Sequence, residues 1–320
     1  MMSRRKLFVI ALASLSCGAT FSPPSLVNSV RILAIQANPP YAAPGTPVQL
    51  QILAFDGRAV QTQPMTVAWL PQACFDPPAD TYYACYAPLA SLVQPGQDVT
   101  SLLTSGSTFS FTMPNDVITN HGAAKTSDPY GVAFGFAVAC AGTVEYVGFS
   151  TQNPSANPLG CFDASGNALD ANSFVLAYSM IYSFGDRTNA NPLISNLTFN
   201  GNPVDPTAGI TVSACTEADT KKCPTSDIDT VVPASSQEPD PGSLDGSGNP
   251  LKEQIWVDYY VTGGSVSAEA VILYDASLGA LPASPTKLTA PNAPAESILW
   301  AIVRDNRGGV SWLQVPFHVM

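Results

Sequence analysis

The chain has 320 residues and a formal net charge of −11, with 46% hydrophobic and only 12% charged residues. This composition argues against global disorder, which requires low hydrophobicity together with high charge. The acidic balance disfavours nucleic acid as a partner, because its phosphates would be repelled.

The first 16 residues have the pattern of a signal peptide. Arg4, Arg5 and Lys6 form a positively charged start, and residues 7–13 form a short apolar segment. This segment is too short to span a bilayer as a helix, so export followed by removal of residues 1–16 is expected. The two arginines leave the twin-arginine route open beside the general export route.

Cys17 follows the apolar segment directly and precedes Gly18. This arrangement resembles a bacterial lipobox, whose cysteine becomes the lipid-bearing first residue of the mature chain. Ser16 fits the small residue before the cysteine, whereas Ser14 stands where leucine is usual, so cleavage by the general signal peptidase is the alternative. We therefore predict a lipidated tether at residues 17–28 and a place at the outer membrane or cell surface. A periplasmic or secreted protein is the alternative.

Short strands are predicted through residues 29–186. In residues 48–55 every second residue is apolar, which is typical of a strand with one buried face. Residues 132–140 carry large side chains on one face and small ones on the other, which predicts a central strand with a close neighbour on its small face. Further strands are predicted at residues 30–37, 65–70, 109–113, 144–149 and 174–182.

The loop from Cys74 to Cys85 carries Tyr82 and Tyr83, and Tyr86 follows it. Closed by a disulfide, such a loop would offer rigid aromatic contacts to a protein or glycan partner. The interpretation we favour is that these tyrosines cover the edge of the fold.

After a turn-rich junction at residues 186–192 the strand pattern restarts. The stretch 233–250, rich in Pro, Gly and Asp, is expected to be a long exposed loop. We predict an all-β fold with two antiparallel immunoglobulin-like or PKD-like β-sandwich domains in tandem, at residues 29–186 and 187–320. Strands of the second half are predicted at residues 193–199, 210–215, 254–261, 269–274, 297–304 and 310–319.

Residues 298–319 predict a β-hairpin that closes the second sandwich, with glycines in its turn that permit positive φ. Alternation makes Trp300 and Trp312 cross-strand or diagonal neighbours. We expect both to anchor the sandwich core with Trp256, so that Trp300→Ala costs about 3–5 kcal/mol.

The turn of this hairpin is expected to be exposed. Arg304 and Asp305 should reach solvent, and Arg307→Ala should change the stability by less than about 0.5 kcal/mol.

The closing hairpin resembles that of PKD-like and immunoglobulin-like bacterial surface domains, which have a strand, a D-x-x-G-G turn and a strand. The whole layout resembles a family of bacterial surface lipoproteins of unassigned function. It departs from true immunoglobulin domains, because residues 48–55 contain no cysteine for the inter-sheet disulfide. The resemblance is carried by Cys17, residues 38–40, Trp69, Cys74 and residues 304–312.

Apart from Cys17, six cysteines remain, and an even number in an exported chain predicts disulfides. The connectivity stays open, although proximity along the chain favours local pairs. There is no CxxC pair and there are only two histidines, so neither a metal site nor a cofactor is expected. The favoured pairs are Cys74–Cys85, Cys140–Cys161 and Cys215–Cys223.

No nucleophile, metalloprotease or nucleotide-binding motif is found. His121 and His318 are the two imidazoles, and both are expected to be structural. Four glutamates lie on or beside predicted strands and are expected on solvent faces: Glu145, Glu253, Glu269 and Glu296.

Two turns, residues 163–167 and 245–249, read D-x-S-x-N and could offer oxygen ligands to calcium. Neither continues as an EF-hand, so ordinary hairpin connectors are expected.

These features predict a non-catalytic exported surface lipoprotein that acts in adhesion, in binding or as a component of an envelope assembly. The alternative is an exported hydrolase or a carbohydrate-binding accessory protein, which rests on the scattered carboxylates and the loop tyrosines.

Overall fold

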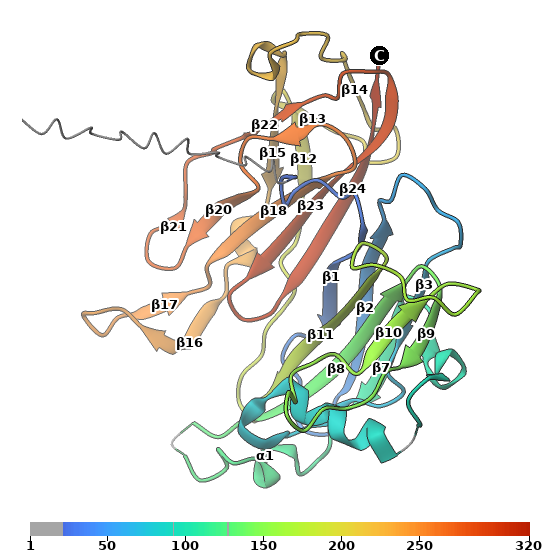
Figure 1. Cartoon of the computed structure of the whole chain (residues 1–320). Coiled ribbons are helices and arrows are strands. Elements are labelled where there is room, and N and C mark those ends of the chain that lie inside the picture. Colours follow the sequence, from blue (N-terminus) through green and yellow to red (C-terminus); the bar gives the residue numbers. More distant parts are fainter. Residues whose placement is uncertain (1–21, 92, 127) are drawn as a thin grey trace, which may run out of the picture.

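The computed structural model describes residues 22–91, 93–126 and 128–320 (Figure 1). Strands make up 45% of the chain and helices 8%, so the predicted predominance of β-structure is confirmed. The predicted signal peptide and Cys17 lie outside the described residues. No helix in the described part of the chain is long and apolar enough to cross a membrane.

The N-terminal half contains three sheets (Figure 1). The first orders β1 (Val30–Asn38), β2 (Pro47–Asp56) and β7 (Thr108–Thr112). The second orders β11 (Phe174–Ser183), β8 (Gly131–Cys140), β3 (Thr66–Trp69) and β6 (Thr104–Ser105), with β4 (Cys74–Phe75) also on β8. The third orders β10 (Leu159–Phe162), β9 (Thr143–Tyr146) and β5 (Gln97–Asp98). Short helices lie at η1 (Pro78–Asp80), η2 (Tyr82–Ser91), η3 (Thr100–Leu102) and α1 (Val117–Asn120).

β8 is the central strand of this half, and every one of its residues is buried. Its small residues Ala133 and Ala137 pack against Leu50 and other apolar residues of the first sheet. Its opposite face, with Phe134 and Phe136, packs under the layer formed by β9, β10 and the η2 segment. The predicted central strand with a close neighbour on its small face is therefore present.

The C-terminal half contains two larger sheets and a separate two-stranded arm. One sheet orders β13 (Asn202–Pro203), β12 (Asn196–Phe199), β15 (Thr225–Val231), β22 (Thr286–Thr289) and β19 (Ser265–Val266). The other orders β14 (Ile210–Val212), β24 (Val310–Val319), β23 (Ala295–Asp305), β18 (Ile255–Val261), β20 (Ala270–Asp275) and β21 (Gly279–Ala280). Their shared core includes Leu197, Ile228, Val257, Leu299 and Phe317, all fully or almost fully buried. β14 pairs with β24 in parallel, whereas the other strand pairs are antiparallel. One short helix of this half is η4 (Thr220–Lys222).

Residues 233–250 were expected to be an exposed loop, and the structure corrects this. They form η5 (Ala234–Ser236) and most of a hairpin of β16 (Pro239–Leu244) and β17 (Pro250–Lys252), called here the β16–β17 arm. The base of the arm is tied down, because the buried Gln237 donates from Nε2 to Glu253 O at 2.8 Å and to Asp275 O at 2.9 Å. The rest of the arm is largely exposed.

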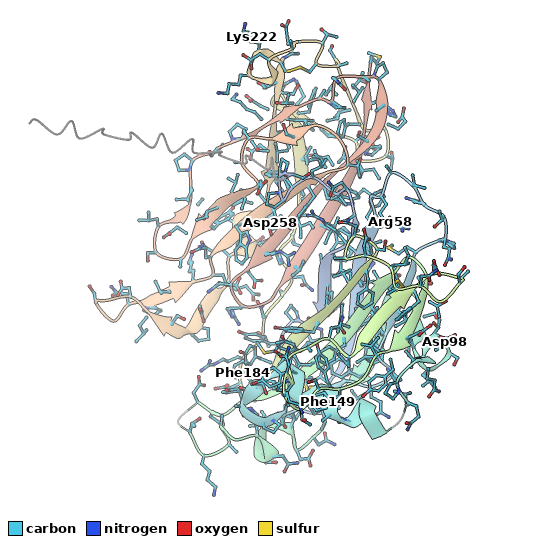
Figure 2. The ribbon with its side chains drawn as sticks, viewed as in Figure 1. Arg58, Asp98, Phe149, Phe184, Lys222 and Asp258 are labelled. Atoms are coloured by element: carbon cyan, nitrogen blue, oxygen red, sulfur yellow. A yellow bond between two sulfur atoms is a disulfide. The ribbon has the colours of Figure 1, made fainter. Side chains whose placement is uncertain are left out.

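The two halves contact each other along β1 and the β23–β24 hairpin, which lie side by side in Figure 1. Arg304 Nε donates to Asp258, labelled in Figure 2, at 2.9 Å, and its Nη2 donates to Leu33 O at 2.8 Å. Gln36 Nε2 donates to Val310 O at 2.5 Å. Arg304 is therefore only partly exposed and links the halves.

The same contact corrects the expected place of Trp300. Its ring is fully buried, but it packs with Leu33 and Ala34 of β1 rather than in the core between the C-terminal sheets. Trp312 stands opposite Ile302 and Trp300 opposite Gln314, so the two tryptophans are diagonal neighbours, as expected. Trp256 lies opposite Arg304 and is only partly buried, and it does not belong to the buried cluster that contains Trp300.

Part of the expected tether is built into the fold. Val27 N donates to Val261 O at 2.8 Å, and Val261 N donates to Ser25 O at 2.9 Å. Both Ser25 and Val27 are buried. Residues 25–27 therefore extend the C-terminal sheet beside β18.

Candidate functional site

Three disulfides join Cys74 to Cys85, Cys140 to Cys161 and Cys215 to Cys223, the pairs that proximity along the chain favours. Disulfides of this kind are typical of exported proteins. They indicate an oxidising, extracytoplasmic location.

The loop closed by Cys74–Cys85 brings its tyrosines onto the outer face of the second sheet. Tyr82 stacks on Tyr178 of β11 with ring centroids 4.7 Å apart, and Tyr83 meets Tyr82 edge-on at 5.5 Å. Tyr82 and Tyr83 are partly buried, while Tyr178 is 45% exposed. We call Tyr82, Tyr83 and Tyr178 the tyrosine surface.

Tyr86 does not belong to this surface. It is only 3% exposed and packs on Phe136 with ring centroids 5.6 Å apart. Burial raises the pKa of its hydroxyl to about 12. Tyr86 therefore follows the interpretation in which the loop tyrosines cover the fold, while Tyr178, from a distant strand, lies beside Tyr82.

Two aspartates fix the loop in position. Asp76 N donates to Val132 O, and Val132 N donates to Asp76 Oδ1, both at 3.0 Å. Burial raises the pKa of the Asp76 carboxyl. Asp80 accepts a hydrogen bond from Tyr130 Oη at 2.8 Å, which raises the pKa of Tyr130 to about 12. The loop is therefore held by backbone and side-chain bonds as well as by its disulfide.

His121 is part of the same corner and has both ring nitrogens engaged. Ala123 N donates to His121 Nδ1 at 3.0 Å, so Nδ1 is an acceptor and the ring proton lies on Nε2. Nε2 then donates to Asp80 Oδ1 at 2.7 Å. In this arrangement neither nitrogen is left to take a proton from a substrate.

Beside the disulfide lies a cavity of about 170 Å³. Its walls are mainly apolar, and Pro71 and Gln72 on it are exposed. Its other lining residues are Leu70, Ala73, Cys74, Cys85, Pro88 and Phe136.

Three of the four glutamates singled out in the sequence have separate partners. His318 Nδ1 and Glu296 are 2.5 Å apart on exposed strand positions. Ser25 Oγ donates to Glu269 at 3.1 Å. Glu253 is completely buried and accepts from Arg307 Nη1 at 2.9 Å. Glu253 is therefore not on a solvent face, which corrects its expected position.

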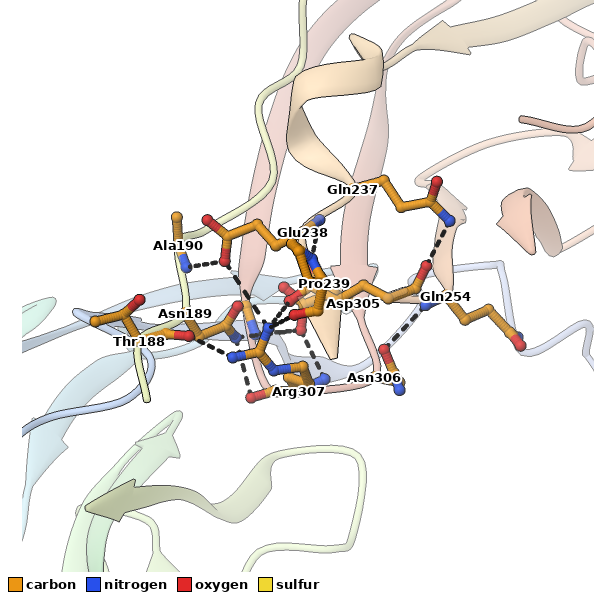
Figure 3. A network of polar contacts seen from close by, with 12 residues as sticks. Thr188, Asn189, Ala190, Gln237, Glu238, Pro239, Gln254, Asp305, Asn306 and Arg307 are labelled. Atoms are coloured by element: carbon orange, nitrogen blue, oxygen red, sulfur yellow. Dashed lines mark hydrogen bonds and ion pairs between the residues drawn. The ribbon is translucent and has the colours of Figure 1, made fainter. Parts of the chain in front are cut away.

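The turn of the β23–β24 hairpin is the largest departure from the sequence prediction (Figure 3). Arg307 is 7% exposed and Asp305 4% exposed, although both were expected near solvent. Arg307 Nη1 also donates to Pro239 O at 2.9 Å, and its Nη2 donates to Thr188 O. The guanidinium lies 4.9 Å from the centre of the Tyr41 ring. The Arg307 side chain therefore connects the turn to the β16–β17 arm, to the linker at residues 186–192 between the two halves, and to Tyr41 in the N-terminal half.

The carboxylates of this cluster are strongly affected by burial. Burial and the charge of Asp305 raise the pKa of Glu253 to about 8. Burial also raises the pKa of Asp305, although Arg307 N and Gly309 N each donate to its Oδ1 at 2.8 Å. The bonds to Oδ1 explain the D-x-x-G-G spacing, since Asp305 accepts from two later residues of its own turn.

The two D-x-S-x-N turns use their aspartates as turn acceptors. Asp163 Oδ1 accepts from Ser165 N at 2.8 Å and Asn167 N at 2.9 Å. Asp245 makes the corresponding bonds with Ser247 and Asn249. Among the described residues, no group of three or more His, Cys, Asp or Glu is placed to hold a metal ion.

No family model matches the chain, and no curated protein matches it. Among solved structures it is similar to dimeric latent PorU from Porphyromonas gingivalis, with 13% identity and a TM-score of 0.23, over 92% of this chain and 24% of that one. It is also similar to Escherichia coli alpha-2-macroglobulin activated by porcine elastase, with 10% identity and a TM-score of 0.20, over 93% and 22%. These are distant similarities to β-rich regions, and the chain spans about a quarter of each matched structure.

Two features of the site were missed by sequence reasoning. Tyr178 lies almost a hundred positions after the loop closed by Cys74–Cys85, and only the pairing of β11 with β8 brings it next to Tyr82. The buried pair of Glu253 and Arg307 joins residues 54 positions apart. Its one sequence signal is the unusually charged glycine turn that contains Arg307.

Proposed function

We propose that this protein is a non-catalytic, exported binding protein of the bacterial cell surface, anchored by lipid on Cys17 and acting in adhesion or in an envelope assembly. The observation that carries the proposal is the tyrosine surface on a loop fixed by a disulfide. Tyrosines give a large contact area at low cost in conformational entropy. Because the loop is already fixed, little further ordering opposes binding.

A protein partner suits this surface better than a glycan. Sugars stack on a free aromatic face, but Tyr82 and Tyr178 turn their faces toward each other at an interplanar angle of 17°. The mainly apolar cavity beside the disulfide would accept an aliphatic or aromatic side chain, the kind of anchor found at the centre of protein interfaces.

The non-catalytic part of the proposal is supported by how the candidate groups are used. His121 has both nitrogens engaged within the protein. Glu253 is buried against Arg307, away from any substrate. These arrangements suit structural roles better than proton transfer to a bound substrate.

We expect the double variant Tyr83→Ala, Tyr178→Ala to bind outer-membrane preparations at least about tenfold more weakly than the wild-type mature protein. The lost aromatic contacts are the reason, and equilibrium binding of the purified proteins measures it. Leu278→Ala is the matched control, because Leu278 is 79% exposed on the turn before β21. Equal affinities for wild type and double variant would refute this role, and retained binding to immobilised glycans alone would redirect the partner assignment to glycans.

We expect Cys17→Ala to abolish incorporation of a labelled fatty acid and to release the protein from the membrane fraction. Lipidation requires the cysteine thiol, which this substitution removes. Ser22→Ala is the control and should leave the incorporation of the label unchanged. Growing cells with the labelled fatty acid and fractionating them measures both effects. Equal labelling of wild type and Cys17→Ala would contradict the anchor.

A further inference from the structure

The Arg307 cluster contains more buried negative charge than one guanidinium neutralises (Figure 3). Glu253 is completely buried with Oε1 2.9 Å from Arg307 Nη1, and Asp305 is buried in the same turn as Arg307. Glu238 adds a third carboxylate, 4.0 Å from the same guanidinium and partly exposed. Two fully charged buried carboxylates beside one arginine would leave a buried net negative charge, which is costly.

The hydrogen bonds of Asp305 indicate where a proton would reside. Its Oδ1 accepts from Arg307 N and Gly309 N at 2.8 Å, and Asn189 Nδ2 lies 3.5 Å away. Its Oδ2 is buried and has no hydrogen-bond partner among the described residues, and the same is true of Asn189 Oδ1. A carboxylate oxygen that receives no donor is the natural position for a proton.

The cluster joins three segments, namely the linker 186–192, the base of the β16–β17 arm and the β23–β24 turn. Arg307 donates to Thr188 O of the linker and to Pro239 O of the β16–β17 arm. Ala190 N donates to Glu238 Oε2 at 3.1 Å, and Glu238 N donates to Glu253 Oε2 at 3.1 Å. A change of charge within the cluster therefore acts directly on the linker and on the base of the arm.

We infer that Glu253 and Asp305 share one proton at neutral pH, and that the cluster is a proton-dependent latch closing the linker 186–192 and the β16–β17 arm onto the β23–β24 turn. This device goes beyond the proposed binding function and does not depend on it.

The direction of the pH dependence follows from the pKa values of the two carboxyls in the closed and in the opened state of the latch. Burial raises the pKa of both carboxyls in the closed state, that of Glu253 to about 8 and also that of Asp305, whereas in an opened, solvated state both pKa values return toward their ordinary range. The latch is therefore fully closed below those ordinary values and loosens as the pH rises toward about 8. The neighbouring titratable groups are Tyr41, whose ring lies 4.9 Å from the guanidinium, and Asp240 on β16, whose charge acts on Tyr41. Lys252 of β17 stands opposite Pro239 in the arm, and the Arg187 guanidinium lies beside Gly242.

Hydrogen exchange of the full mature protein tests the latch at the amides of residues 186–192 and 237–253. After correction for intrinsic exchange rates, we expect their opening in the wild type to increase by up to about tenfold per pH unit between about pH 5 and pH 8. Glu253→Gln and Asp305→Asn each remove one of the two charges, so each should make this opening nearly independent of pH. Glu217→Gln is the control and should keep the wild-type slope, because Glu217 is an exposed residue outside the cluster.

A flat wild-type profile, or an unchanged slope in both Glu253→Gln and Asp305→Asn, would overturn the latch. If one of these two variants fails to fold, the slope of the other still tests the latch. Infrared spectroscopy of the wild type gives an answer that needs no variant: a protonated-carboxyl band should be present at neutral pH and vanish at alkaline pH, and its absence at neutral pH would overturn the shared proton.

Discussion

Arg307→Ala should lower the free energy of unfolding by about 3–5 kcal/mol, far more than a turn residue normally costs. The substitution leaves Glu253 and Asp305 buried without their cation. It also removes the donors to Thr188 O and Pro239 O. Denaturant unfolding of the purified mature protein measures the loss.

Lys287→Ala is the control for this prediction. Lys287 pairs with Asp227 at 2.8 Å, and the two side chains are 56% and 46% exposed. An exposed pair of this kind contributes at most about 1 kcal/mol. Adding Glu253→Gln to Arg307→Ala should recover part of the loss, because a neutral side chain no longer lacks a cation. Similar small losses for Arg307→Ala and Lys287→Ala would show that the cluster does not stabilise the fold.

Trp300→Ala should also cost about 3–5 kcal/mol, because it empties a fully buried site. The cavity would open between β1 and the β23–β24 hairpin, where Trp300 packs edge-on against Phe55 with ring centroids 5.0 Å apart. The indole Nε1 also donates to Gln314 Oε1 at 3.0 Å. The loss is again measured by denaturant unfolding.

Trp256→Ala serves as the control, since Trp256 lies on the same sheet but is only partly buried, and it should cost about 1–2 kcal/mol. A double-mutant cycle tests whether Trp300 contacts Phe55, as the structure shows. Phe55→Ala and Trp300→Ala should be coupled by about 0.5–1.5 kcal/mol, as expected for touching aromatic rings. Strict additivity of the two substitutions would place Trp300 elsewhere in the fold.

Local patterns in the sequence predicted those elements whose environment is set by neighbouring residues. The contrast of large and small side chains along residues 132–140 identified the central strand β8 correctly. The D-x-x-G-G turn predicted the β23–β24 hairpin, and Gly308 in it has a φ of 94°. Both signals are local, because alternation and turn chemistry act over a few residues.

Features that depend on distant segments were not predictable in the same way. Alternation placed Trp300 on one face of β23, but the strand that covers this face is β1, more than 250 positions earlier. An exposed turn is the usual position for an arginine that precedes two glycines, and only its contacts with Glu253 and Thr188 make Arg307 a buried residue. Burial of a charge is decided by its partners, which alternation does not reveal.

The central claim, that the tyrosine surface contacts a protein at the cell surface, is tested most directly by photo-crosslinking in living cells. A photoreactive amino acid at position 83 or 178 should give the same discrete protein adduct, and the same group at position 278 should give none. No adduct at positions 83 and 178, or an identical adduct at position 278, would contradict the assignment of this surface.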